Sequence, residues 1–142
     1  MKNKNVIVEL KRIAKKHGGL LQPEMVVESA RPASSPLHSR FEWNNTVAGH
    51  QHRIWQARQL IRVSVEMIPG TEMETDVFVS LSPDREKESG GYRMMADVLS
   101  DEQRRAQMFS DALAELESFR ERYKQLKELA QVFDAISKLH RR

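Results

Sequence analysis

Apolar residues recur at intervals of three and four positions in three segments of the first 62 residues, a spacing that predicts amphipathic helices. We place these helices at residues 5–17, 23–31 and about 47–60. Gly18-Gly19 ends the first, because glycine accepts the left-handed conformation found after helix ends. Asn44-Asn45-Thr46 offers a cap to the third. The residues expected to be buried are Ile7, Leu10, Ile13, Ala14, Val26, Val27, Ala30, Val47, Ala48, Ile54, Trp55, Ala57, Leu60 and Ile61.

The spacing then changes from helical to alternating. Residues 63–67 alternate apolar and polar side chains, as do residues 77–81 beyond the turn signal Pro69-Gly70. Two such runs predict an antiparallel hairpin with one buried face. Residues 92–95 are a candidate for a short third strand. The apolar members of the two runs are Val63, Val65, Met67, Val77, Val79 and Leu81.

The final third of the chain carries the longest regular pattern. Ser100 and Gln103 match a capping box, and neither Pro nor Gly follows up to Arg142. Seven apolar residues then alternate spacings of four and three, which would place them on one oligomerisation seam: Ala112, Leu116, Phe119, Tyr123, Leu126, Ala130 and Phe133. Further apolar residues widen the seam into a stripe typical of a helical bundle: Leu113, Leu129, Val132, Ile136 and Leu139.

An unbroken helix over residues 101–139 would be roughly 58 Å long at 1.5 Å per residue. A compact domain of this chain length has a radius of gyration of about 14–15 Å. The segment therefore either breaks into two helices that fold back, or packs its stripe on a second chain. Because no turn signal interrupts it, we expect a homodimer or larger homo-oligomer.

These patterns together predict an α+β protein that is mostly α. N-terminal helices and a central antiparallel hairpin would occupy residues 1–98. A C-terminal oligomerisation arm, one long amphipathic helix or a helical hairpin, would occupy residues 99–142.

The net charge of +3 is unevenly distributed along the chain. Residues 1–62 contain eleven Lys and Arg against four Asp and Glu, which gives +7. Residues 63–142 contain twelve against sixteen, which gives −4. The asymmetry indicates that the N-terminal half meets an anionic partner, although solvated helices rich in lysine and arginine would give the same count.

Composition excludes several classes of protein. Without cysteine the chain has no disulfide, no thiolate zinc site and no thiol nucleophile. No apolar run approaches the roughly 20 residues that span a bilayer. The basic N-terminus is not followed by the apolar core of a signal peptide, so we expect a cytoplasmic protein.

Sequence motifs of catalysis are not found. Gly18-Gly19 and Gly90-Gly91 are not followed by the Gly-Lys-Ser/Thr of a phosphate-binding loop. His50 and His52 would point roughly 200° apart on a helix, so they would not share a metal ion. No Gly-x-Ser-x-Gly nucleophile motif occurs. We expect no enzyme, no cofactor and no metal; a hydrolase whose site assembles only in space is the weakest alternative.

The predicted order of elements, three helices and then a hairpin, is that of winged-helix DNA-binding domains. There the third helix enters the major groove of double-stranded DNA. The base-facing candidates are His50, Gln51, Arg53, Gln56, Arg58 and Gln59. The candidates for DNA-backbone contacts are Lys11, Lys15, Lys16, Arg40 and Arg62.

Two features oppose the winged-helix interpretation. About 13 residues separate the second and third predicted helices, whereas a helix-turn-helix uses three or four. The predicted hairpin loop also carries Glu72 and Glu74, which repel phosphate. The alternative is a core helix whose polar side faces water.

Phe41-Glu42-Trp43 places two aromatic residues just before the cap of the third helix. Such a pair could form a knob that binds a partner. Packing of the two rings against the following helix is the interpretation we favour, because apolar residues before a cap commonly pack on the first turns of a helix.

Residues 35–45, Ser-Pro-Leu-His-Ser-Arg-Phe-Glu-Trp-Asn-Asn, resemble a group of uncharacterised bacteriophage and prophage proteins. The resemblance extends over residues 18–28, 57–62 and 91–93, and so covers most of the chain. It implies a phage or prophage origin and brings no catalytic or ligand-binding residue with it. Our first hypothesis is therefore a phage-type DNA-binding protein, regulatory or architectural. The alternative is a protein–protein adaptor in phage assembly or host takeover, without nucleic acid.

Overall fold

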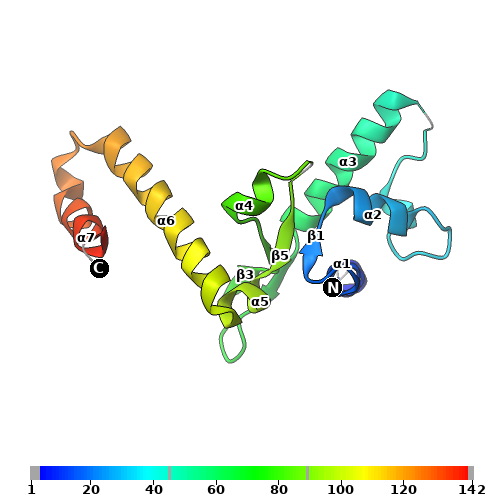
Figure 1. The fold of residues 1–142 in the computed structure, drawn as a ribbon, viewed down its shortest axis with the longest axis horizontal. Helices are drawn as coiled ribbons and strands as arrows, with labels where there is room; N and C mark the ends of the chain where they lie inside the picture. The colour runs from blue at the N-terminus through cyan, green and yellow to red at the C-terminus, as the bar shows by residue number, and fades with distance from the viewer. Residues whose placement is uncertain (1–3, 45, 89, 141–142) are drawn as a thin grey trace. The chain divides into compact units, whose positions relative to one another are not determined.

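The protein is described by a computed structural model that covers residues 4–44, 46–88 and 90–140 (Figure 1). It divides into an N-terminal unit, residues 1–100, and a C-terminal unit, residues 101–142. This division lies two residues beyond the boundary expected from the sequence. The expected class is confirmed: the fold is α+β and mostly α, with small antiparallel sheets.

Helices and short strands make up the N-terminal unit. In chain order they are α1 (Lys4–Lys16), β1 (Leu20–Leu21), α2 (Pro23–Ala30), η1 (His38–Arg40), α3 (Val47–Arg62), β2 (Val65–Met67), β3 (Glu74–Asp76), β4 (Phe78–Val79), α4 (Ser82–Arg85), β5 (Tyr92–Met94) and α5 (Met95–Ser100). The predicted helix ends hold at α1, where Gly18 and Gly19 have positive φ and the Gly19 amide donates to the Ala14 carbonyl at 2.7 Å. At α3 the Thr46 hydroxyl accepts from the Gly49 amide at 2.9 Å, while Asn45 lies outside the described residues.

The predicted third strand is the centre of a three-stranded sheet. β5 pairs antiparallel with β1 on one side and with β4 on the other. Strand β1 therefore belongs to a different sheet from the β2–β3 hairpin. Sixteen residues, 31–46, separate α2 from α3, so no short helix-turn-helix connection is present there.

The first strand of the predicted hairpin forms, but its partner strand and its buried face differ from the prediction. β2 pairs with the polar strand β3, not with residues 77–81. Val77 and Phe78 are adjacent and both buried, which breaks the expected alternation. On the opposite face of β2, Glu66 is partly buried and forms an ion pair with Lys11 of α1 at 2.9 Å. The apolar residues expected in the core are exposed: Val63, Val65 and Met67.

One hydrophobic core joins α1, α2, α3 and the three-stranded sheet. Its fully buried side chains include Leu10, Ile13, Leu21, Leu37 and Ile61. α3 buries Ile54, Ala57 and Ile61 as expected. Its predicted core face is wrong for the large side chains Val47 and Trp55, which are 81% and 54% exposed.

Phe41 and Trp43 pack, as favoured from the sequence. Phe41 is buried, and the Trp43 ring stacks on His38 with centroids 4.9 Å apart. The Trp43 indole N–H donates to the His38 carbonyl at 2.9 Å. The guanidinium of Arg53, a residue of α3, lies 5.4 Å from the centre of the Trp43 ring. These contacts fix the segment before α3 onto the helix.

The C-terminal unit is a helical hairpin, not one continuous helix. α6 (Glu102–Tyr123) ends in a turn, followed by η2 (Lys127–Leu129) and α7 (Ala130–His140). α7 folds back along the end of α6: Phe119 lies 6.2 Å from Phe133 between ring centroids, and Arg120 donates to Ser137 at 2.6 Å. The cap is Asp101, which accepts from the Arg104 amide at 2.9 Å; the expected cap, Ser100, is one residue too early.

The break selects the helical hairpin from the two alternatives that the sequence left open, and it divides the seven seam residues between α6, the turn and α7. Leu126 lies in the turn and is 47% exposed. Helix propensity alone would carry the chain through this segment, since neither Pro nor Gly occurs there. Folding back buries Ile136 and pairs the aromatic rings, and such contacts outweigh the few tenths of a kcal/mol per residue that propensity contributes.

Candidate functional site

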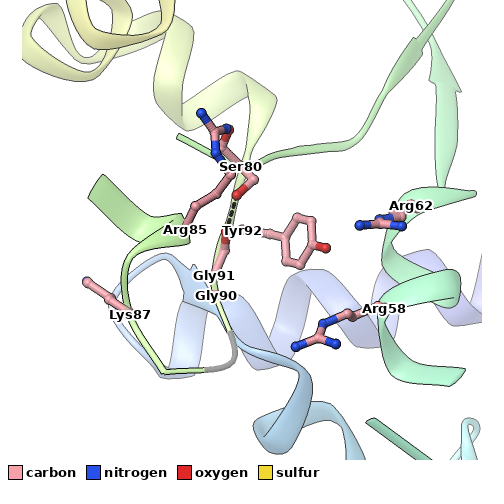
Figure 2. A pocket seen from close by; sticks show the side chains of 8 residues that line it. All are labelled: Arg58, Arg62, Ser80, Arg85, Lys87, Gly90, Gly91 and Tyr92. Carbon is pink, nitrogen blue, oxygen red and sulfur yellow. Dashed lines mark hydrogen bonds between the residues drawn. The ribbon is translucent and has the colours of Figure 1, made fainter. Parts of the chain in front are cut away.

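A pocket of about 480 Å³ on the N-terminal unit gathers several cations (Figure 2). It lies between the last turns of α3 and the segment that runs from β4 to β5. The residues that line it are Arg58, Arg62, Ser80, Arg85, Lys87, Gly90, Gly91 and Tyr92. We call it the basic pocket.

Two arginines of α3 form one wall of the basic pocket. Arg58 and Arg62 are four residues apart, so they lie one above the other on the same helix face. Figure 2 shows the Tyr92 ring extending from β5 toward both guanidinium groups, with its hydroxyl leading. Arg85 and Lys87 lie on the other side of the β5 main chain and form the rim. The α3 pair and Tyr92 are therefore the groups that converge.

Glycine makes the opposite wall possible. The Ser80 hydroxyl donates to the Gly91 carbonyl at 2.8 Å, and Arg85 donates to the Ser80 carbonyl at 2.6 Å. A Cβ on Gly91 would lie 2.8 Å from a methyl carbon of Leu20, closer than such atoms approach. Gly90 has a φ of 76°, which other residues rarely adopt. The Gly90-Gly91 pair thus brings the backbone against β1 at the pocket floor.

A buried ion pair stands behind this wall. Asp84 of α4 is 3% exposed and accepts two hydrogen bonds from Arg93 of β5, at 2.8 and 3.1 Å. Lys87 also approaches Asp84, at 3.5 Å. The charge of Arg93 is therefore used within the fold, and that of Lys87 is partly balanced.

The basic pocket favours an anion. None of the described residues that line it is acidic, while four are cationic. Arg58 and Arg62, as like charges at this helical spacing, destabilise an isolated helix by a few tenths of a kcal/mol. Within the described ranges no carboxylate pairs with Arg62. A phosphate between the two guanidiniums would remove the repulsion and accept paired hydrogen bonds, the geometry for which arginine is suited.

The structure separates the predicted base-facing residues. Arg53 is 3% exposed, donates to the Glu42 carbonyl at 3.2 Å and to that of Asn44, and so does not face a ligand. Gln56 accepts from the Glu42 amide at 3.1 Å. The expectation for Arg53 is wrong because the segment before α3 needs donors for its carbonyls, and Arg53 supplies them. The remaining candidates lie on different sides of α3: His50, Gln51, Arg58 and Gln59.

The predicted backbone-contact residues also divide. Arg62 lines the basic pocket, while Lys11 is engaged with Glu66. Lys15 and Lys16 are exposed in the last turn of α1, and Arg40 is exposed in η1. Of eleven candidates, the structure brings Arg58 and Arg62 together at the basic pocket.

Sequence reasoning missed Arg85, Lys87 and Tyr92. They lie 23 to 30 residues after the end of α3, in a segment that carries as many acidic as basic residues and so gives no charge signal. The one hint in the sequence was Gly90-Gly91 directly before Tyr92, an aromatic residue of the candidate third strand.

The seam residues of the C-terminal unit form a second candidate surface. Phe119 and Phe133 pack within the hairpin. Large apolar side chains stay uncovered within the described part of this unit, among them Phe109, Tyr123, Leu126 and Val132. Ile136 is the only one of its described residues that is buried.

The described residues contain neither a candidate metal site nor a candidate membrane-spanning helix. No group of three or more histidine, aspartate or glutamate side chains there could hold a metal ion. None of the helices in that part of the chain is long and apolar enough to cross a membrane.

Comparison with known proteins adds no relative. No family model, no curated protein and no solved structure matches the chain.

Proposed function

We propose that this is a non-catalytic, phage-type DNA-binding protein that contacts phosphates through the basic pocket and acts as a homodimer or larger oligomer in the host cytoplasm. The observation that carries the proposal is the convergence of Arg58, Arg62 and Tyr92 without an acidic neighbour among the described lining residues. The excess of +7 in residues 1–62 supports it, because such a field attracts a polyanion.

Contact through phosphates fits the structure better than groove reading by the whole predicted set. Arg53 and Gln56 are used within the fold. Backbone contacts position a protein on nucleic acid without reading its sequence. Weak sequence preference and steep salt dependence are therefore expected.

The test is fluorescence anisotropy with labelled DNA at low and moderate salt. The double variant Arg58→Gln/Arg62→Gln should weaken binding about tenfold or more, since a charged hydrogen bond contributes about 1.5–3 kcal/mol. The slope of log K against log salt should become shallower by about 1.5–2, because two phosphate contacts are lost.

The matched control is Arg105→Gln/Arg122→Gln, which removes the same charge from two exposed positions of α6. Its affinity should stay within about twofold of the unchanged protein, since charges outside a contact are largely screened. If the wild-type protein binds no DNA at low salt, or if both double variants bind as it does, the proposal is wrong.

Self-association is supported by the C-terminal unit. A two-helix hairpin of this size, with one buried side chain among its described residues, has too little core to be stable alone. Residues 101–140 carry eight acidic and seven basic residues, a balance of −1, so two copies would repel each other little. We therefore propose a second copy of the chain as the partner of its uncovered apolar side chains.

Light scattering gives the test of self-association. A mass near a multiple of 16.5 kDa is expected, and Leu126→Glu should lower it by placing a charge among uncovered apolar side chains. Gln125→Glu, an exposed polar neighbour, is the control that should not change the mass. A mass of one chain at high concentration would refute the dimer. The uncovered apolar side chains would then be the binding surface of the alternative function, an adaptor for a different protein in phage assembly or host takeover.

A further inference from the structure

Trp55 is the largest exposed side chain of α3 that the core does not use. It is 54% exposed, whereas a tryptophan in a small domain is usually well buried. Within the described residues its indole N–H makes no hydrogen bond. Trp43, in the same unit, shows the contrast: its N–H is bonded and its ring is covered by His38 and two guanidiniums.

Trp55 lies on the same stripe of α3 as the arginines of the basic pocket. On a helix, residues seven apart differ by about 20° in direction and about 10.5 Å in height. Arg62 therefore follows Trp55 almost directly along the helix, with Arg58 between them and about 60° to the side. A flat aromatic surface and a pair of cations thus share one exposed strip, which ends in the basic pocket.

His52 is the neighbour that contacts the Trp55 ring. Its imidazole stacks on Trp55 with ring centroids 5.7 Å apart and an angle of 13° between the planes. Both residues are exposed, so this stack does not contribute to the core. The stack leaves more than half of the Trp55 side chain accessible. We call His52 and Trp55 the aromatic stack.

We infer that the strip binds a nucleic-acid strand with unpaired bases: its phosphates lie in the basic pocket and a base stacks on Trp55. This inference rests on the proposed function and adds the class of ligand. Aromatic side chains that stack on bases beside a cationic groove are the usual means of binding single strands. In a duplex the base faces are covered by one another, so Trp55 would have no stacking partner there.

The experiment compares three labelled probes of equal length: oligothymidylate, oligouridylate and a duplex, each of about 12 nucleotides, the scale of a single-strand binding site. The unchanged protein should bind at least one single strand more tightly than the duplex. The two single-strand arms separate a DNA ligand from an RNA ligand, which share the proposed chemistry.

The variants are Trp55→Ala, Trp55→Phe and the exposed-position control Val47→Ala. Trp55→Ala should weaken single-strand binding by about 5- to 150-fold, the effect of losing one stacked base. Trp55→Phe should recover part of the affinity, because a smaller ring still stacks. Val47→Ala, on the same helix and 81% exposed, should leave binding unchanged. Thermal unfolding of all three should match the unchanged protein.

The possible results separate the two proposals. If the duplex binds as tightly as the single strands, or if Trp55→Ala binds oligothymidylate and oligouridylate normally, the inference is overturned. The proposed function survives that result provided that the Arg58→Gln/Arg62→Gln variant still loses affinity. If no probe binds at low salt, both fail.

Discussion

Replacing Arg53 by Ala should destabilise the N-terminal unit much more than replacing Arg58 by Ala. The two arginines lie five residues apart on α3, and the sequence assigned both to base contacts. In the structure Arg53 is 3% exposed and holds the segment before the helix, while Arg58 lines the basic pocket. Comparing the two variants therefore tests whether burial or sequence position decides what an arginine of α3 does.

The expected loss follows from the contacts of Arg53. Two hydrogen bonds from the guanidinium, to the carbonyls of Glu42 and Asn44, contribute about 1.5–3 kcal/mol each. The approach to the Trp43 ring at 5.4 Å adds about 0.5–1 kcal/mol. Against this, the buried Arg53 Nε finds no partner among the described residues, which costs about 1–3 kcal/mol in the native state. The net loss should be about 2–4 kcal/mol.

Arg53→Lys should recover less than half of that loss, because an ammonium lacks the planar fork that reaches two carbonyls and lies over a ring. Arg58→Ala, at a partly exposed position, should cost about 1 kcal/mol or less, because solvent screens the interactions of an exposed charge.

Urea denaturation followed by tryptophan emission is the suitable assay. Both tryptophans, Trp43 and Trp55, belong to the N-terminal unit, so the signal reports that unit alone. With a slope of about 2 kcal/mol per molar urea, the midpoint for Arg53→Ala should fall by about 1–2 M. An unchanged midpoint together with lost DNA affinity would refute the structural role and restore Arg53 as a ligand contact.

Three further results are expected. Gly49→Ala should lower the free energy of unfolding by about 1–3 kcal/mol, although alanine favours helix, because its Cβ would collide with the Asn44 carbonyl; a urea midpoint above that of the unchanged protein would contradict this. Asp84→Ala should cost about 3 kcal/mol or more by leaving the Arg93 guanidinium buried and uncompensated, and a melting temperature within a degree or so of the unchanged protein would be the contrary result. The hydrogen bond that Glu9 accepts from the arginine three residues later lowers the pKa of the Glu9 carboxyl below the ordinary 4.5. The stability that this carboxylate confers is therefore present at neutral pH and is lost as acid protonates the carboxylate. Carboxyl NMR titration should give a pKa below 4.5 for Glu9, and a pKa at or above 4.5 would show that the hydrogen bond is absent.

Local patterns were sufficient for α1, α2 and α3, but not for the short helices α4 and α5. The stripes of α1 and α2, the glycine stop after α1 and the threonine cap of α3 depend on residues within one or two turns of each other. Such interactions operate before any tertiary contact forms, so spacing and capping chemistry are enough to predict them. The α+β class followed from the same patterns.

Partners distant in the sequence decided what local patterns could not. On β2 the residue that contacts α1 is Glu66, which pairs with Lys11, and not an apolar neighbour. Arg53 is buried because carbonyls about ten residues earlier need a donor. An arginine on a helix looks the same in the sequence whether it lies in a pocket or under a loop. Its role depends on which backbone groups the folded chain leaves without partners.

The basic pocket shows the same division. The sequence by itself determined that its two arginines share a face of α3, and that a glycine pair precedes an aromatic strand residue. Only the tertiary structure brought Tyr92, Arg85 and Lys87 to that helix, through pairing of β5 with β1 and β4. In the C-terminal unit the sequence determined an apolar stripe, and the fold decided that it bends after Tyr123. The physical reason is that helical periodicity is a local property, whereas the placement of a turn or a pocket depends on burial gained between segments far apart in the chain.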